Sequence, residues 1–172
     1  MAHNLQHNYA QEVWDKDRQH FLHPWTHFDS FDKNGSLVMN EGDGAYVTDI
    51  HGKRYLDGIG GIWCVNIGYG REEIVQAIAE QARKLPFYNP FVDTTNVPAA
   101  ELAAKLAELA PGDLDHVIFT GGGSTANDSA YRLIQYYQRD RGKPEKRNII
   151  ARKEAYHGST DMAANLSGKA SD

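Results

Sequence analysis

Apolar residues in the second half of the chain follow two different spacings. In 71–85 and in 96–112 they recur every three or four positions, which is the period of an amphipathic helix. The segments HVIFT (116–120) and NIIAR (148–152) are short, continuous and rich in β-branched residues, as buried strands are. Helical spacing returns between them, over 123–139. The order helix, strand, helix, strand predicts an α/β domain with a parallel sheet.

The first half of the chain contains shorter elements. Residues 9–22 predict a helix that ends before Pro24 and forms an N-terminal arm. Residues 37–57 contain three β-like runs separated by the turn sequences EGDG and DIHG, which predicts a small antiparallel meander. Because a parallel sheet covered on both faces needs more than two strands, we expect the chain to be the first part of a longer protein.

The composition excludes two classes of partner. The chain has 172 residues, of which 41% are hydrophobic, so it is about one domain long and has the material for a core. A formal net charge of -5 and a pI near 5.9 argue against binding to nucleic acid or to a membrane surface. The single cysteine, Cys64, excludes an intrachain disulfide, and the first thirty residues lack the apolar core of a signal peptide. These features predict a cytoplasmic protein.

Three consecutive glycines join the first strand-like segment to the helix that follows. A strand that leads through Gly121, Gly122 and Gly123 into a helix directs free backbone N–H groups and the positive end of the helix dipole at one point. Ser124 and Thr125 add hydroxyl groups in the first helical turn. The pattern favours a phosphate-binding loop, and the alternative is a simple glycine turn with Ser124 as a helix cap.

The glycine loop alone does not identify the phosphate. GGGSTA matches the G-x-G-x-x-A form of the dinucleotide-binding fingerprint, so a nicotinamide-dependent oxidoreductase is a second hypothesis. That hypothesis needs an acid at the end of the next strand, about 20 residues onward, where the chain instead has a charged link near Asp140. No Gly-Lys-Ser/Thr follows the glycines, which excludes a P-loop.

A second informative stretch, EAYHGST, follows the second strand-like segment. Tyr156 and His157 offer flat rings at the edge where open α/β sheets bind ligands. Tyr156 taken alone is more simply interpreted as a partly buried loop aromatic. Together with the glycine loop at the neighbouring strand end, however, it predicts a planar, phosphorylated cofactor.

Other candidate residues have structural interpretations. Pro24 breaks any helix that would align the nearby histidines, so we expect no metal site. Asp128 lies in the first turns of the helix after the glycines, and we expect it to have a structural or interface role. Cys64 has no evident base beside it and is expected to be a small buried residue.

Several motifs in order resemble one family of enzymes. From about His20 to the last residue, the chain resembles the class III, pyridoxal-phosphate-dependent aminotransferases, especially the ω-amino acid or amine:pyruvate branch. The resemblance implies an α/β fold of the type I pyridoxal 5'-phosphate (PLP) transferases. It places an N-terminal arm and small-domain segment in residues 1–70 and the start of the PLP-binding large domain, with its mainly parallel sheet, in 71–172. The motifs are HPWTH, LDGIGGIWCVNIGYGR, LPFYNPF, PGDLDHVIFTGGGSTAND, GKPEKRNIIARKEAYHGST and NLSGK.

The resemblance also implies roles for residues at the cofactor. Gly122, Gly123 and Ser124 match the family's phosphate-loop residues. Tyr156 matches the aromatic that stacks on the cofactor ring, and His157 lies beside it. The implied activity is transfer of an amino group from an ω-amino acid or amine to a keto acid such as pyruvate.

Three aromatic residues match family positions around the substrate. Trp25 and Trp63 match residues that line the substrate pocket, and Phe91 matches a residue that reaches the partner subunit's site. The resemblance therefore implies a homodimer with active sites at the subunit interface.

The sequence departs from the family pattern in two ways. The family loop commonly has the sequence Asn-Ser-Gly-Ser-Glu, and here Gly121, Gly122 and Thr125 replace its Asn, first Ser and Glu. No lysine of this chain lies in a motif that matches the family's Schiff-base lysine. We therefore expect no catalytic residue in the chain. We expect that lysine, and the aspartate that binds the pyridine nitrogen, to lie beyond Asp172. A non-catalytic fragment that at most binds phosphate or a partner subunit therefore stands as a third hypothesis.

Overall fold

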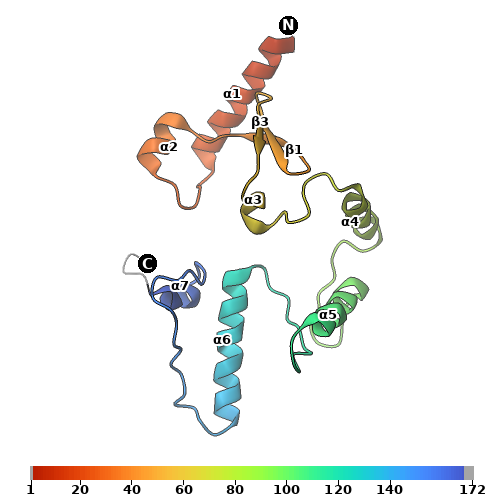
Figure 1. The fold of residues 1–172 in the computed structure, drawn as a ribbon, viewed down its shortest axis with the longest axis vertical. Coiled ribbons are helices and arrows are strands. Elements are labelled where there is room, and N and C mark those ends of the chain that lie inside the picture. Colours follow the sequence, from red (N-terminus) through yellow and green to blue (C-terminus); the bar gives the residue numbers. More distant parts are fainter. Residues whose placement is uncertain (1, 169–172) are drawn as a thin grey trace. The chain divides into compact units, whose positions relative to one another are not determined.

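The chain forms two compact units. The computed structural model describes the backbone of residues 2–168 and the side chains of residues 8–168. The units comprise residues 1–88 and 89–172, and each is described by itself. Within the described residues, the first unit contains a small sheet and helices α1 to α4, and the second contains helices α5 to α7 (Figure 1).

Two helices open the first unit. α1 (Ala2–His20) is the predicted N-terminal helix, and it starts well before the predicted bound. α2 (Phe28–Asn34) was not predicted. It ends at Gly35, which has a φ of 63° and whose N–H donates to the carbonyl oxygen of Phe31 at 2.7 Å. A Cβ at Gly35 would collide with the side chain of Trp14, so the end of α2 lies directly against α1.

The predicted meander is confirmed. β1 (Met39–Asp43), β2 (Tyr46–Asp49) and β3 (Arg54–Leu56) form an antiparallel sheet in that order. Val47 of β2 lies opposite Tyr55 of β3, and a bulge near the start of β1 shifts its register against β2.

A buried carboxylate closes the turn between β2 and β3. Asp49 is 5% exposed and accepts hydrogen bonds from the N–H groups of His51 and Lys53, both at 2.9 Å, and from the Tyr55 hydroxyl at 2.8 Å. Burial acts to raise the pKa of Asp49, but these hydrogen bonds outweigh it and hold the pKa below its ordinary value. The turn is therefore held at neutral pH and released only as the pH falls through that lowered pKa.

A tight turn and a regular helix complete the first unit. The segment α3 (Gly60–Trp63) is kinked, with a φ of 57° at Ile62 inside it. Cys64 was expected to be buried, and that expectation is wrong: the kinked turn leaves Cys64 exposed, with its Sγ donating to the carbonyl oxygen of Ile62 at 3.4 Å. α4 (Glu72–Lys84) is the predicted amphipathic helix.

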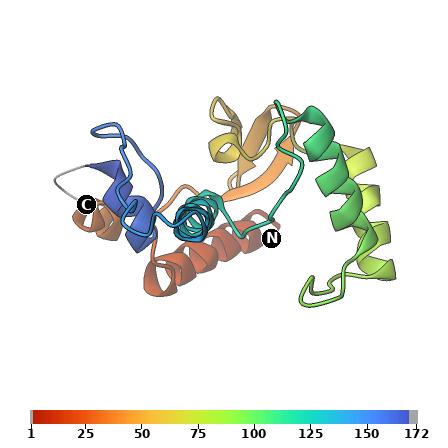
Figure 2. The same cartoon turned by 90° about the horizontal axis from the view of Figure 1, so that it is seen from below.

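The second unit contains the other three helices. α5 (Val97–Leu109) begins at the expected cap, where the N–H of Ala99 donates to Asn96 Oδ1 at 3.0 Å. α6 (Gly123–Asp140) follows the three glycines as predicted. α7 (Asp161–Ser167) packs beside α6, as the end-on view of α6 shows (Figure 2).

The two strand-like segments of the second unit are not strands in the structure. Residues 116–120 and 148–152 have no ladder hydrogen bonds, and the one sheet among the described residues is β1–β2–β3 of the first unit. A strand exists only when its N–H and C=O groups pair with a neighbour, and these two segments do not pair with each other. Their apolar side chains are accordingly uncovered, and Ile150 is 100% exposed.

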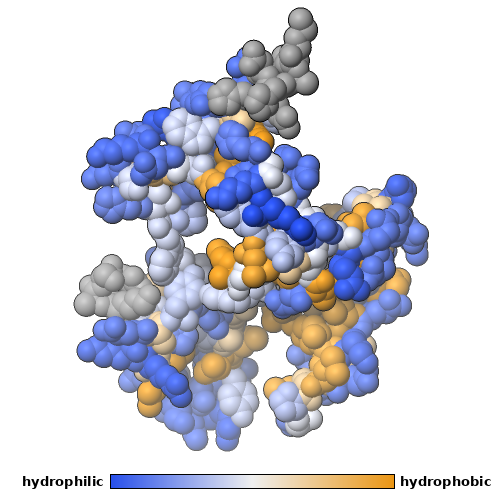
Figure 3. Space-filling view, turned by 45° about the horizontal axis from the view of Figure 1, so that its top comes forward, coloured by the Kyte–Doolittle hydropathy of each residue, from blue (hydrophilic) through white to orange (hydrophobic). Residues whose placement is uncertain are grey.

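Little apolar surface is buried in either unit. Among the residues with described side chains, Ala10 and Ala163 are the buried apolar ones. Figure 3 shows apolar side chains, in orange, open on the surface. Leu133 of α6, for example, is 54% exposed. No helix within residues 2–168 is long and apolar enough to cross a membrane.

Candidate cofactor-binding site

The N-terminus of α6 presents unused backbone donors. The first N–H bonded within the helix is that of Ala126, which donates to the Gly122 carbonyl oxygen at 2.9 Å. The N–H groups of Gly123, Ser124 and Thr125 precede it, so helical geometry provides no acceptor for them. Thr125 turns its hydroxyl back on Gly122, accepting from its N–H at 3.1 Å and donating to its carbonyl oxygen at 2.8 Å. The Thr125 side chain therefore caps the helix, and the three N–H groups remain available to an acceptor outside the helix.

The three glycines leave open space around this end of the helix. A Cβ at Gly121, Gly122 or Gly123 would meet no atom of the chain within 4 Å. None of the three has a φ in the left-handed region, and Gly122 has an extended φ of 172°. Neither backbone strain nor packing within the chain therefore requires glycine at these positions. The open space at the three positions leaves room for the close approach of a phosphate to the α6 N-terminus.

The segment 156–160 lies directly against the first turns of α6. The N–H of Ser159 donates to Ser124 Oγ at 3.0 Å, and the side-chain amide of Asn127 donates to the His157 carbonyl oxygen at 2.6 Å. One turn further, the Thr160 hydroxyl donates to Asp128 at 2.9 Å. The structure thus brings the glycine loop and the stretch that carries Tyr156 and His157 into one site. Asp128 has the structural role that was expected.

Ser124 retains its hydroxyl proton for a ligand. Because its Oγ accepts the Ser159 N–H, the Ser124 hydroxyl is oriented with its proton pointing away from that bond. The neighbouring Tyr156 ring is 59% exposed, and its hydroxyl shares a hydrogen bond of 3.0 Å with Ser159 Oγ. The Ser124 hydroxyl and the Tyr156 side chain are therefore linked through Ser159.

His157 carries a buried ring nitrogen without a protein partner. Its backbone N–H donates to Ser167 Oγ at 3.4 Å, which attaches the segment to α7. Its Nε2 is shielded from solvent and has no hydrogen-bond partner among the described residues.

Sequence reasoning missed the importance of Gly158. Its φ is 143°, and a Cβ there would lie 2.5 Å from Ser124 Oγ, 2.6 Å from Ala163 Cβ and 2.8 Å from Ser124 Cα. Gly158 is the residue that allows the two halves of the site to touch. The sequence signal was the glycine that directly follows Tyr156 and His157.

The three aromatic residues expected around the substrate are all largely exposed. Trp25, Trp63 and Phe91 are 83%, 77% and 78% exposed. Trp25 and Trp63 have φ values of 58° and 65°, a region that large L-residues rarely adopt and that occurs most often where function constrains the backbone. Trp25 and Trp63 belong to the first unit, whereas Phe91 belongs to the second with the α6 N-terminus.

Asp57 holds the turn that carries Trp63, and sequence reasoning missed it. Its carboxylate accepts hydrogen bonds from the Tyr69 hydroxyl at 2.7 Å and from the N–H of Gly61 at 2.8 Å. The Tyr69 hydrogen bond, supported by the backbone donors and opposed by burial, holds the pKa of Asp57 below its ordinary value. Asp57 is therefore ionised at neutral pH and fixes the strained turn.

Known proteins similar to this chain are aminotransferases. The family model Aminotransferase class-III matches residues 29–172. The chain is 44% identical over 151 residues to a putrescine–pyruvate aminotransferase of Pseudomonas aeruginosa, covering 88% of this chain and 33% of that protein. It is also 44% identical over 133 residues to a mitochondrial γ-aminobutyrate transaminase of Oryza sativa subsp. japonica. That match covers 77% of this chain and 26% of that protein.

Solved structures give the same result. An (S)-enantioselective ω-transaminase from Thermomicrobium roseum is 43% identical, with a TM-score of 0.91 over 94% of this chain and 36% of that one. The ω-transaminase of Pseudomonas jessenii, solved in complex with PMP, is 37% identical, with a TM-score of 0.88. That match covers 91% of this chain and 35% of that one.

The comparisons confirm the expected fold type. The neighbours are transaminases of the PLP-dependent fold type I, and this chain spans about a third of their length. Class III aminotransferases are PLP-dependent, and one of the neighbours was solved in complex with PMP. Since the family model covers most of the sequence, this chain belongs to the class III aminotransferases.

Proposed function

We propose that this chain is the N-terminal portion of a PLP-dependent transaminase that moves an amino group from an ω-amino acid or amine to a keto acid such as pyruvate. Membership of the class III family supports the reaction type. The names of relatives support the substrates, because one is named for putrescine and pyruvate and others are ω-transaminases.

One contact carries the proposal for the cofactor. The hydrogen bond from the Ser159 N–H to Ser124 Oγ joins the phosphate end of the site to its aromatic end. We assign the phosphate to Gly122, Gly123 and Ser124, and the face of the pyridine ring to Tyr156, with His157 beside it. A phosphate dianion gains charge-assisted hydrogen bonds from the α6 N–H groups and the Ser124 hydroxyl.

The residues of this chain hold and orient the cofactor. Bound PLP supplies the electron sink that makes proton loss from the substrate amine possible. Anchoring the phosphate and stacking the ring fix the direction in which the reacting carbon points, which lowers the entropic part of the barrier. The lysine that joins the cofactor belongs, in this proposal, to residues beyond Asp172.

We further propose that Trp25, Trp63 and Phe91 line the substrate pocket. The strained backbone at both tryptophans supports this assignment. A thermostable ω-transaminase variant engineered for asymmetric synthesis of enantiopure bulky amines, 36% identical to this chain, has a tryptophan and a phenylalanine substituted. Those two positions are separated by the same number of residues as Trp63 and Phe91.

Shortening Trp63 should therefore widen the range of amino donors. In the complete transaminase, Trp63→Ala should raise kcat/KM for amines with a bulky substituent relative to small donors, because the indole no longer limits the space. The affinity for PLP should stay within about twofold, since Trp63 is not part of the phosphate loop. Trp14→Ala, in the same unit, serves as a control for loss of an indole. A donor profile unchanged by Trp63→Ala would remove Trp63 from the pocket.

The assembly and domain boundaries follow from the same proposal. Many apolar side chains are uncovered in this chain, which supports their burial against the rest of the protein and against a second subunit. We therefore propose a homodimer. Within it, residues 1–70 form the arm and small-domain segment, and residues 71–172 begin the large domain. We propose small-molecule substrates in the cytoplasm, with no nucleic-acid or membrane partner.

The two alternative functions have less support. The nicotinamide-dependent alternative requires an acid at the tip of a second strand, and residues 148–152 form no strand in the structure. The non-catalytic alternative agrees with one observation: none of the described contacts at the N-terminus of α6 involves a lysine. It does not explain why Ser124, Gly158 and Tyr156 are arranged together.

The reaction is tested by a product assay. The complete protein, with PLP, putrescine as donor and pyruvate as acceptor, should form alanine faster than free PLP does. Replacing pyruvate with buffer is the matched control. Alanine formation no faster than with free PLP, over a panel of putrescine, β-alanine and γ-aminobutyrate, would contradict the proposed function.

A further inference from the structure

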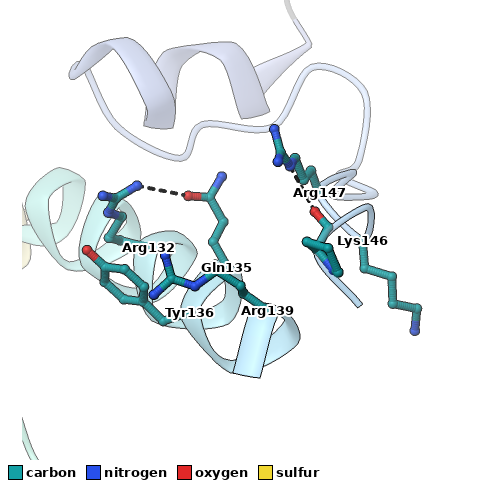
Figure 4. Close-up of a pocket in the computed structure, with 7 residues that line it drawn as sticks. Arg132, Gln135, Tyr136, Arg139, Lys146 and Arg147 are labelled. Atoms are coloured by element: carbon teal, nitrogen blue, oxygen red, sulfur yellow. Dashed lines mark hydrogen bonds between the residues drawn. The ribbon is translucent and has the colours of Figure 1, made fainter. Parts of the chain in front are cut away.

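A polar pocket lies toward the opposite end of α6 from the candidate cofactor site. It has a volume of about 300 Å³ and lies between α6 and the loop that follows it (Figure 4). The α6 residues that line the pocket run from Arg132 to Arg139. With a helical rise of 1.5 Å per residue, they lie roughly 12 to 22 Å from Ser124 along the helix axis. The residues that matter here are Arg132, Gln135, Tyr136, Arg139, Lys146 and Arg147.

The pocket concentrates positive charge. Four of its lining side chains are cationic and none is acidic. Among the described residues, the ion pair that these four side chains make is a loose one, from Arg139 Nε to Asp140 at 3.9 Å between exposed groups. On a chain with a formal net charge of -5, such a local excess of cations is not a consequence of composition.

Neighbouring groups hold the arginines in place. The guanidinium groups of Arg132 and Arg139 both lie over the Tyr136 ring, at 4.7 Å and 5.2 Å from its centroid. From the loop, Arg147 Nε donates to the Pro144 carbonyl oxygen at 2.9 Å, which fixes the base of that side chain and not its terminal nitrogens. Like charges are thus held close together, and a bound anion would relieve their repulsion.

The pocket occupies the polar face of α6. The apolar positions of the helix, at 100° per residue, are centred on the opposite side. The pocket therefore lies on the side of α6 that faces away from its apolar positions. The apolar positions are Ala130, Leu133, Ile134 and Tyr137.

We propose that this pocket is an anion-binding site, distinct from the cofactor site, for a small phosphate-class ligand with two or more negative charges. Arginine forks bind phosphate oxygens with two parallel hydrogen bonds, and Arg132, Arg139 and Arg147 supply three such forks around one cavity. A nucleic acid would need an extended basic stripe, whereas this charge is confined to a single concave site.

Pyrophosphate titration of the PLP-loaded complete protein tests the proposal. Saturation with PLP keeps the probe out of the cofactor site, and calorimetry should detect one further site that weakens as salt is raised. Arg132→Gln combined with Arg139→Gln should weaken pyrophosphate binding about tenfold or more, because each lost guanidinium removes hydrogen bonds to a charged group. Arg141→Gln, on the same helix end but outside the pocket, should leave binding unchanged.

Three results would overturn the proposal. The first is no pyrophosphate binding by the wild type at millimolar concentration. The second is equal binding by the wild type and the double variant. The third is tighter binding of a single-stranded oligonucleotide than of pyrophosphate, which would indicate a nucleic-acid surface. If the double variant is unfolded by circular dichroism, the Lys146→Gln variant provides the same comparison.

Discussion

Replacing Gly158 with alanine should abolish tight PLP binding by the complete transaminase. The new Cβ would lie under 3 Å from the Oγ and Cα of Ser124 and from Ala163 Cβ, and two of these atoms are not on flexible side-chain ends. The φ of 143° adds backbone strain that glycine alone avoids. The segment must therefore move away from α6, and the Ser159 to Ser124 hydrogen bond breaks. Backbone strain of about 1–3 kcal/mol and overpacking of about 1–3 kcal/mol together should lower the affinity for PLP about 30-fold or more.

Gly142→Ala is the matched control for Gly158→Ala. Gly142 also has a positive φ, at 72°, but a Cβ there would meet no atom within 4 Å. This variant therefore carries backbone strain without a collision and lies at the other end of α6. PLP titration by absorbance, with melting curves for each variant, separates the two effects. Equal PLP affinity in Gly158→Ala and Gly142→Ala would show that the close approach of 158 to Ser124 has no role in the site.

The 172-residue chain expressed alone should be inactive and should associate with itself. Within the described side chains only Ala10 and Ala163 are buried apolar residues, while Val92 is 91% and Ile150 is 100% exposed. A chain with so little buried apolar area gains too little from the hydrophobic effect to offset the entropy of folding as a monomer. Sedimentation should show mixed oligomers that shift with concentration, and no cooperative thermal transition.

The same chain provides a test for the missing lysine. Mixed with PLP, putrescine and pyruvate, it should form alanine no faster than free PLP. Borohydride treatment, followed by peptide mapping, should trap no single lysine specifically. Faster turnover together with one trapped lysine would contradict the assignment of the catalytic lysine to residues beyond Asp172. A monomer with a sharp unfolding transition would contradict the prediction of self-association.

Elements with local causes were predictable from the sequence. α4, α5 and α6 follow from helical spacing, and the meander follows from alternating runs between strong turn sequences. The segments 116–120 and 148–152 have strand composition, yet they form no ladder, because a strand depends on a partner as well as on its own sequence. α2 was missed because seven residues are too short for a clear period.

The two halves of the site were predictable from the sequence. The glycine loop and the Tyr156 stretch each carried a signal, and their places after two neighbouring strand-like segments already predicted one site for a planar, phosphorylated cofactor. What sequence could not provide was the contact between Ser124 and Ser159, residues far apart along the chain. Gly158 and Asp57 were missed for the same reason: their roles depend on which atoms the fold brings beside them.

The most informative contact to test is the proposed one between Ser124 and the cofactor phosphate. The direct measurement compares PLP with pyridoxal, which lacks the phosphate, in the complete wild-type protein and in Ser124→Ala. The variant should bind PLP about 1.5–3 kcal/mol more weakly, the range for a hydrogen bond to a charged group. Its binding of pyridoxal should weaken less, because a ligand without a phosphate loses only the support of the Ser159 to Ser124 hydrogen bond. Equal weakening of both ligands, or no weakening of PLP, would contradict a phosphate site at the N-terminus of α6.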